Sequence, residues 1–103
     1  MKKSLLLVSS LFALSISSSL FAADIKAGKE KATSCAECHG TEGISPAGMF
    51  PNLAGQHAEY LESALKQYRD GDRVNDMMTG MVRDLTDETI ANLAAYYASL
   101  KSN

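Results

Sequence analysis

Cys35-Ala36-Glu37-Cys38-His39 is the stretch of this sequence that decides the fold. The pattern C-x-x-C-H is typical of covalent haem attachment, because each cysteine sulfur can add to a haem vinyl group. Two intervening residues place both sulfurs along one haem edge, and the histidine that follows can ligate the iron. The chain has no other cysteine and only one other histidine, which is too few ligands for a zinc site. We therefore expect one covalently bound haem c, held by Cys35, Cys38 and His39.

Residues 1–23 have the layout of a secretory signal peptide. Lysines follow the initial methionine, an apolar run comes next, and the small residues Ala22 and Ala23 end the segment. Cleavage is plausible after either alanine. A retained membrane anchor is the alternative, but the apolar run is short for a span of about 20 residues and serines interrupt it. We expect export to the periplasm of a bacterium, with no stable membrane insertion after cleavage.

The mature chain, residues 24–103, is one short domain whose side chains alone would form a marginal core. A buried haem supplies apolar surface, so the cofactor should be part of the core. Without the two lysines of the signal peptide, eight basic residues stand against twelve acidic ones, a formal charge of −4. An acidic domain does not favour nucleic-acid binding. We expect a single haem domain that is monomeric.

Apolar periodicity and capping residues predict an all-α domain. Asp24 can cap a first helix that ends near Ser34, and Thr86 can cap a last helix. Between them, residues 56–70 form a helix with one apolar face, while the glycines and prolines of residues 40–55 predict a long loop. The two apolar stripes are Ala58, Leu61, Leu65 and Tyr68, and Ile90, Leu93, Ala94 and Tyr97.

Gly71 suits the left-handed position past a helix end, and the polar segment after it is rich in methionine. A thioether is a soft, neutral iron ligand, and Met/His ligation raises the haem potential. Methionine is also a common core filler. Residue chemistry alone leaves the second axial ligand open among Met49, Met77, Met78 and Met81.

These features together resemble the class I c-type cytochromes, above all short bacterial ones and single haem domains of the two-haem c-four group. The resemblance implies a small all-α fold of three to four helices around one covalently bound haem, with the first and last helices crossing. Gly28 and Tyr97 resemble the contact between those helices. The segments that carry the resemblance are Cys35-Ala36-Glu37-Cys38-His39-Gly40, Phe50-Pro51-Asn52-Leu53-Ala54-Gly55-Gln56, Met78-Thr79-Gly80-Met81 and Leu93-Ala94-Ala95-Tyr96-Tyr97.

The resemblance also implies roles for single residues. Met78 matches the first methionine of the family's Met-x-Gly segment, the distal iron ligand, and Met77 is the runner-up. Pro46 resembles the family proline whose backbone carbonyl accepts from the other ring nitrogen of His39. That bond would fix the tautomer of the histidine and strengthen it as a ligand. A plain turn proline is the alternative.

The function implied is that of a soluble periplasmic one-electron carrier, not an enzyme, with iron ligated by His39 and Met78. Its partners would be redox proteins, either membrane-bound or periplasmic oxidases and reductases, approached through an acidic surface. A haem-based small-molecule sensor or peroxidase-like enzyme with a labile Met78 is the alternative. A thiol oxidoreductase using Cys35 and Cys38 would call for a βαβ pattern, which the sequence lacks.

Overall fold

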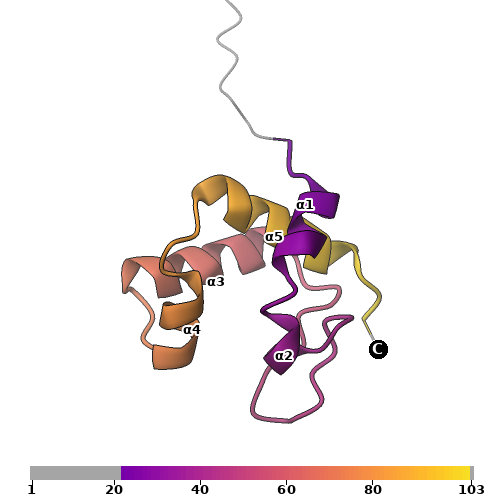
Figure 1. Ribbon diagram of the computed structural model, residues 1–103, viewed down its shortest axis with the longest axis horizontal. Coiled ribbons are helices and arrows are strands. Elements are labelled where there is room, and N and C mark those ends of the chain that lie inside the picture. The colour runs from indigo at the N-terminus through magenta and orange to yellow at the C-terminus, as the bar shows by residue number, and fades with distance from the viewer. Residues whose placement is uncertain (1–21, 103) are drawn as a thin grey trace, which may run out of the picture.

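The structure is a computed structural model that describes residues 22–102, so nearly all of the expected signal peptide lies outside it. The described residues form five α-helices and no strand, which confirms the all-α class, although three to four helices were expected (Figure 1). The helices are α1 (Ile25–Lys31), α2 (Ala36–His39), α3 (Ala58–Asp70), α4 (Asp76–Val82) and α5 (Asp87–Ser99).

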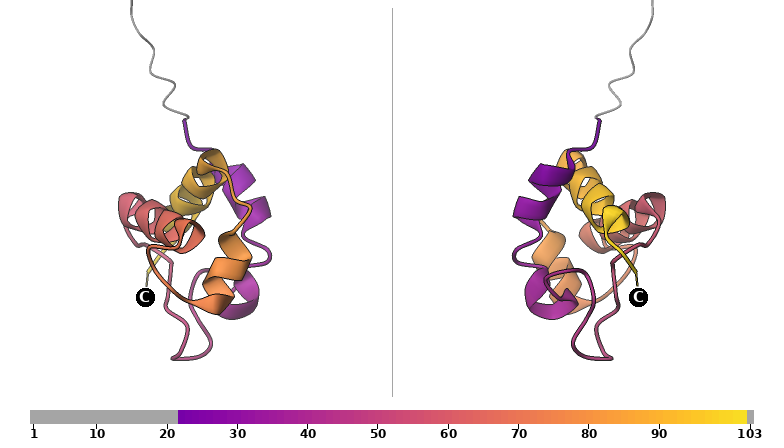
Figure 2. Two further views of the ribbon diagram at one scale, coloured as in Figure 1. Left: turned by 90° about the vertical axis from the view of Figure 1, so that its left-hand side faces the viewer. Right: turned by 90° about the vertical axis from the view of Figure 1, so that its right-hand side faces the viewer.

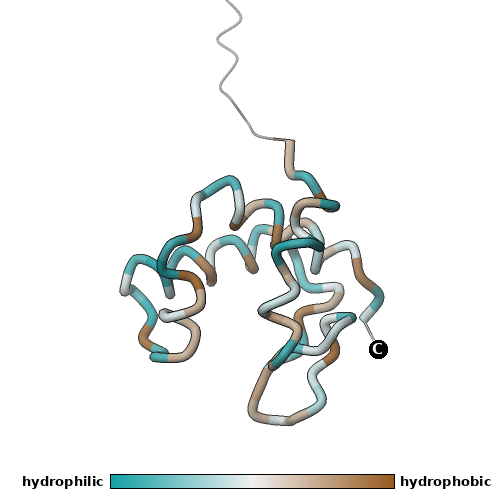
Figure 3. The backbone as a smooth tube through the Cα atoms, viewed as in Figure 1, coloured by the Kyte–Doolittle hydropathy of each residue, from teal (hydrophilic) through white to brown (hydrophobic). Residues whose placement is uncertain are grey.

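Helix α5 is the centre of the helical packing. It lies between α1 and α3 and packs against both, whereas α1 and α3 do not contact each other (Figure 2). Hydrophilic and hydrophobic segments alternate along α3 and α5 (Figure 3), as expected for helices with one apolar face. The predicted stripe of α5 is confirmed, because Ile90, Leu93, Ala94 and Tyr97 are all buried. From α3, Leu61 joins this core.

The crossing of α1 over α5 depends on the absence of a side chain at Gly28. A Cβ atom there would lie 2.0 Å from the backbone oxygen of Asn92 and 2.9 Å from the Cβ of Tyr96. The expected contact between the first and last helices is therefore present, but Tyr96 is the tyrosine opposite Gly28. Tyr97 lies in the same buried core as Tyr96 and also approaches the loop at Gly43, where an added Cβ atom would lie 3.1 Å from its ring.

The long helices begin and end close to the predicted positions. The Thr86 side chain accepts from the Thr89 backbone N–H at 3.1 Å, which confirms the predicted cap of α5. Gly71 ends α3 with φ of 87°, the left-handed conformation expected of it. Helices α2 and α4 were not predicted, because segments of one or two turns are too short to show a periodic pattern.

Residues 40–57 form the expected long loop, which is closed by backbone hydrogen bonds. Gly40, with φ of 86°, turns the chain directly after α2, and a Cβ atom there would lie 1.9 Å from the Ile44 carbonyl oxygen. Further along, the Gly55 N–H donates to the Tyr97 carbonyl oxygen at 2.9 Å. The loop is thus tied at one end to α2 and at the other to the C-terminal turn of α5.

Candidate functional site

The cysteines and the histidine of the C-x-x-C-H motif share one face of α2. Cys35 is the N-cap residue of this helix, and its carbonyl oxygen accepts from the backbone N–H of Cys38 at 3.2 Å and of His39 at 2.9 Å. Side chains three and four positions apart in a helix lie on the same side. Both thiols are free and half-buried. The geometry therefore presents two sulfurs and one imidazole together.

The His39 ring is buried and oriented by a backbone hydrogen bond. Its side chain is only 7% exposed, and Nδ1 lies 2.8 Å from the Pro51 carbonyl oxygen. A carbonyl oxygen only accepts, so the proton resides on Nδ1 and the lone pair on Nε2. The Phe50 ring packs edge-on against the imidazole with centroids 6.3 Å apart. The histidine is thus held with its metal-binding nitrogen fixed.

The expectation that Pro46 supplies this carbonyl is wrong. Pro46 is exposed and sits in a tight turn, where the Ser45 hydroxyl donates to the Ala47 carbonyl oxygen at 2.7 Å. The loop then doubles back, because the Ser45 N–H donates to the Asn52 side chain at 2.7 Å. This reversal brings Pro51, and not Pro46, against His39. Both prolines lie in a loop rich in turn residues, so the sequence did not distinguish them.

Among the candidate methionines, Met78 has the most defined environment. Its backbone N–H donates at 3.0 Å to the side chain of Asn75, which caps α4. Met78 is half-buried, whereas Met49, Met77 and Met81 are 75%, 56% and 49% exposed. This environment favours Met78 as the second ligand. Sequence reasoning missed Asn75, although an asparagine three residues before Met78 is a recognisable cap pattern.

His39 and Met78 come from helices that do not pack on each other. In Figure 1, α2 and α4 are set apart on the same side of α3 and α5. Helix α4 packs only against α3, and α2 packs against none of the other described helices. His39 and Met78 would therefore hold a prosthetic group from two separate helices. The other histidine, His57, is an exposed residue at the start of α3 and lies on neither α2 nor α4.

Cys35 does not have the environment of a catalytic thiol. Burial raises the pKa of the Cys35 thiol, although the neighbouring Ser34 and Tyr97 side chains oppose the shift. Catalytic thiols have lowered pKa values. The Tyr97 hydroxyl is buried without a hydrogen-bond partner among the described residues, and burial raises the pKa of this phenol, to which the neighbouring Cys35 also contributes. Tyr97 belongs to the hydrophobic core, and Cys35 packs against it.

Nowhere in residues 22–102 do three or more histidine, cysteine, aspartate or glutamate side chains gather as a metal site. In the same range every helix is too short or too polar to cross a bilayer.

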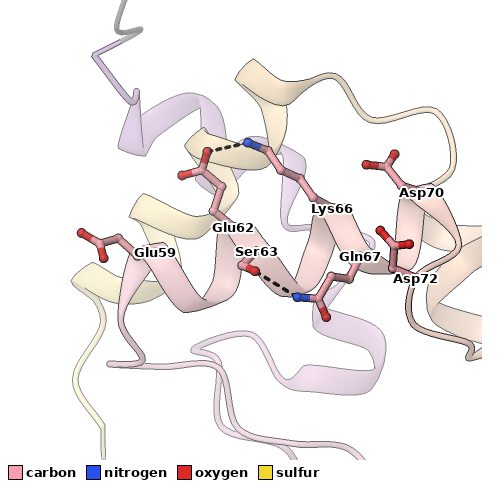
Figure 4. Close-up of a pocket in the computed structure, with 7 residues that line it drawn as sticks. All are labelled: Glu59, Glu62, Ser63, Lys66, Gln67, Asp70 and Asp72. Atoms are coloured by element: carbon pink, nitrogen blue, oxygen red, sulfur yellow. Dashed lines mark hydrogen bonds and ion pairs between the residues drawn. The ribbon is translucent and has the colours of Figure 1, made fainter.

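An acidic groove of about 340 Å³ runs along the exposed face of α3 (Figure 4). We call it the α3 groove. Lys66 pairs with Glu62 at 3.1 Å, and the Gln67 amide donates to Ser63 at 3.0 Å. Of the other acidic side chains, Asp70 pairs with Arg69 at 2.8 Å, and Glu59 and Asp72 are exposed. The lining residues are Glu59, Glu62, Ser63, Lys66, Gln67, Asp70 and Asp72.

Comparison with known proteins decides the family. Residues 25–101 match the model of the family described as Cytochrome c. The chain belongs to the cytochrome c family. Cytochromes c carry covalently bound haem and transfer electrons, so haem c is the cofactor of this chain and electron transfer its general function.

Two relatives and one solved structure show the closeness of the match. The cytochrome is 51% identical over 81 residues to cytochrome c-554(548) of Halomonas halodenitrificans, covering 76% of this chain and 98% of the relative. It is 45% identical over 97 residues to cytochrome c4 of Pseudomonas aeruginosa, covering 93% of this chain but 48% of the relative. The crystal structure of reduced recombinant cytochrome c4 from Pseudomonas stutzeri superposes with a TM-score of 0.74 at 39% identity. That superposition covers 78% of this chain and 47% of the other.

The chain thus spans nearly all of one relative and about half the length of the c4 relatives. The expected fold and the resemblance to a single domain of the c-four group are confirmed. The donor set described above also fits haem c: two unpaired sulfurs and a buried imidazole on one helix face, with a methionine on a separate helix.

Proposed function

We propose that this cytochrome c is an exported one-electron carrier in which Cys35 and Cys38 hold the haem and His39 and Met78 ligate its iron. The observation that carries the proposal is the buried His39, which directly follows Cys38 and donates from Nδ1 to Pro51 at 2.8 Å. A histidine so oriented offers its Nε2 lone pair to a metal.

The haem supplies the one-electron couple of its iron, and the protein sets access and potential. The Pro51 carbonyl draws the Nδ1 proton of His39 toward itself. This makes the imidazole more basic, so Nε2 becomes a stronger electron donor to a metal. Met78 offers a neutral thioether, which favours the reduced iron and raises the potential. Asn75 fixes the turn that presents Met78. With His39 and Met78 both serving as ligands, the two side chains would leave no site on the bound iron for a substrate.

The location and organisation that accompany this function are proposals as well. Residues 1–23 serve as a signal peptide, residues 24–103 form the haem domain, and the mature protein works in the periplasm as a monomer. The layout of the first residues supports export. The acidic surface supports partners with basic docking surfaces, such as membrane or periplasmic oxidases and reductases.

Haem extraction tests the attachment. After denaturation in acid–acetone, the wild-type haem should stay with the polypeptide, because thioether bonds survive this treatment. The variant Cys35→Ala/Cys38→Ala should release any haem into the organic layer. Haem from the wild type in the organic layer would refute covalent attachment through the cysteines.

Carbon monoxide tests the carrier against a sensor or peroxidase-like enzyme. The reduced protein at neutral pH should show no carbon monoxide adduct, because Met78 occupies the sixth position. Full adduct formation within mixing time would show a labile ligand and favour the enzyme or sensor. His57→Ala is the matched histidine control, and it should leave the spectrum unchanged.

A further inference from the structure

The guanidinium of Arg69 joins the end of α3 to the start of α5. Its Nη1 donates to the Leu85 carbonyl oxygen at 3.1 Å and to the Asp87 carboxylate at 2.7 Å. The other edge of the fork, Nε and Nη2, donates to the two carboxylate oxygens of Asp70 at 2.8 and 3.2 Å. The Arg69 side chain is only 19% exposed, so it is a partly buried connection and not a loose surface pair.

These bonds join the two ends of the segment that carries Met78. We call this junction the neck of the segment. Residues 71–86 leave α3 after Asp70 and return to α5 at Asp87, and α4 is the one helix between them. Arg69 and Asp87 are 18 positions apart in sequence, yet their charged groups are in contact. Inside the segment, Val82 is buried, and α4 packs against α3 alone. The segment is therefore held at its neck and along α3, where the Arg73 N–H also donates to the Gln67 carbonyl oxygen at 3.1 Å and the Arg73 guanidinium lies over the Tyr68 ring.

We propose that Arg69 is a positioning residue that keeps the Met78-bearing segment closed and so slows release of the methionine from the iron. The inference rests on the proposed ligation by Met78. Local opening in proteins is governed by the contacts that anchor the segment that moves. Once the neck is released, residues 71–86 are held mainly by the contacts of α4 and Arg73 with α3, and opening becomes easier.

Arginine suits this role better than lysine. One planar fork reaches two carboxylates and a backbone carbonyl at once, whereas an ammonium group offers a single point charge. The Leu85 carbonyl is the informative partner, because it precedes the Thr86 cap and belongs to the segment itself. Replacement by lysine keeps the charge and loses the fork.

The test is the rate at which imidazole displaces the methionine in the ferric, haem-loaded protein. Loss of the methionine-to-iron charge-transfer band is followed at saturating imidazole, where segment opening limits the rate. Arg69→Gln should raise this rate about five- to tenfold, the scale expected for loss of a shared hydrogen-bond network. Arg69→Lys should lie between Arg69→Gln and the wild type. Asp87→Asn should raise the rate as well, and combining it with Arg69→Gln should add little, because both changes break one contact.

Two controls separate positioning from general effects. Lys26→Gln removes a charge on α1 outside any ion pair of the described residues, and it should leave the rate unchanged. Asn92→Ala removes a side chain that accepts from the Asp24 N–H at 2.8 Å, which weakens the fold away from the segment. This variant should lower the denaturation midpoint without a matching rise in rate.

The outcomes are distinguishable. Rates of Arg69→Gln and Asp87→Asn within twofold of the wild type would overturn the proposal, as would an equal rise in Asn92→Ala. Should Arg69→Gln not fold, the Asp87→Asn and Arg69→Lys rates decide. A wild type that lacks the charge-transfer band, or a Met78→Ala protein that keeps it, would instead refute the proposed ligand.

Discussion

The Nδ1 atom of His39 lies 2.8 Å from the carbonyl oxygen of Pro51, twelve residues further along the chain. The ring is buried, and its position follows from a loop that doubles back through the bond between Ser45 and Asn52. Substitution cannot remove a backbone carbonyl. Replacing Pro51 does remove the fixed φ of proline, which helps to orient this carbonyl.

Pro51→Ala should therefore raise the reduction potential. A freer carbonyl weakens the Nδ1 hydrogen bond, and a less basic imidazole stabilises ferric iron less well. The Nδ1 hydrogen bond contributes about 1 kcal/mol. Losing part of it corresponds to a rise in the reduction potential of about 20–40 mV for a one-electron couple. Protein-film voltammetry measures it. Pro46→Ala is the matched control and should leave the potential unchanged; equal shifts in both variants would argue against a specific role for Pro51.

Met78→Ala should abolish the weak methionine-to-iron charge-transfer band and lower the reduction potential. Water or hydroxide would take the position of the thioether, and these ligands favour ferric iron. Met77→Ala, one position away on a residue that is 56% exposed, should keep the band. If the band disappears with Met77→Ala and survives Met78→Ala, the ligand is Met77.

Gly28→Ala should destabilise the fold strongly. The added methyl group would lie 2.0 Å from the Asn92 carbonyl oxygen, so α1 must move away from α5. Overpacking of this kind costs about 1–3 kcal/mol, and denaturant unfolding of the haem-loaded protein measures it. Gly48→Ala is the control, because a Cβ atom there meets nothing within 4 Å. Equal stability of the two variants would show that the helices are not in close contact.

The Arg69 contacts should make stability depend on acid pH. Arg69 lowers the pKa of Asp70 and of Asp87, chiefly by hydrogen bonding; Lys66 also lowers both, and burial opposes them. A lowered folded-state pKa gives stability that is present above the unfolded pKa of about 3.9 and is lost as pH falls through the folded value.

Denaturation midpoints test this dependence. The difference between the wild type and Asp87→Asn should be small, because Asp87 is 67% exposed, and it should shrink between pH 5 and pH 3. It should also shrink with added salt at pH 7. A difference that stays constant over this range would show that the pair does not contribute through charge.

The α3 groove should speed association with a basic electron-transfer partner. Complementary charge raises association rates by about 10- to 1,000-fold, and the effect weakens as ionic strength rises. The second-order rate of electron transfer to a basic oxidant should fall with salt, and Glu59→Gln/Asp72→Asn should flatten that dependence. Glu30→Gln/Glu42→Gln, at exposed sites outside the groove, is the charge-matched control. A rate that is independent of salt would place docking on apolar surface, for which Met49 and Phe50 are candidates.

The sequence by itself determined those features that depend on neighbours in the chain. Spacing in Cys35-Ala36-Glu37-Cys38-His39 places two sulfurs and an imidazole on one face of any helical turn. The Thr86 cap and the apolar stripe of α5 are likewise local, because capping and periodicity act within a few residues. The all-α class and the expectation of haem followed from these local patterns.

Only the tertiary structure decided which distant groups meet. Pro46 and Pro51 both stand in a turn-rich loop, and the reversal held by Ser45 and Asn52 determines which carbonyl reaches His39. The contact of Arg69 with Asp87 spans 18 positions and exists because α3 packs on α5. Such pairings depend on the path of the whole chain through space, and no pattern of neighbouring residues encodes them.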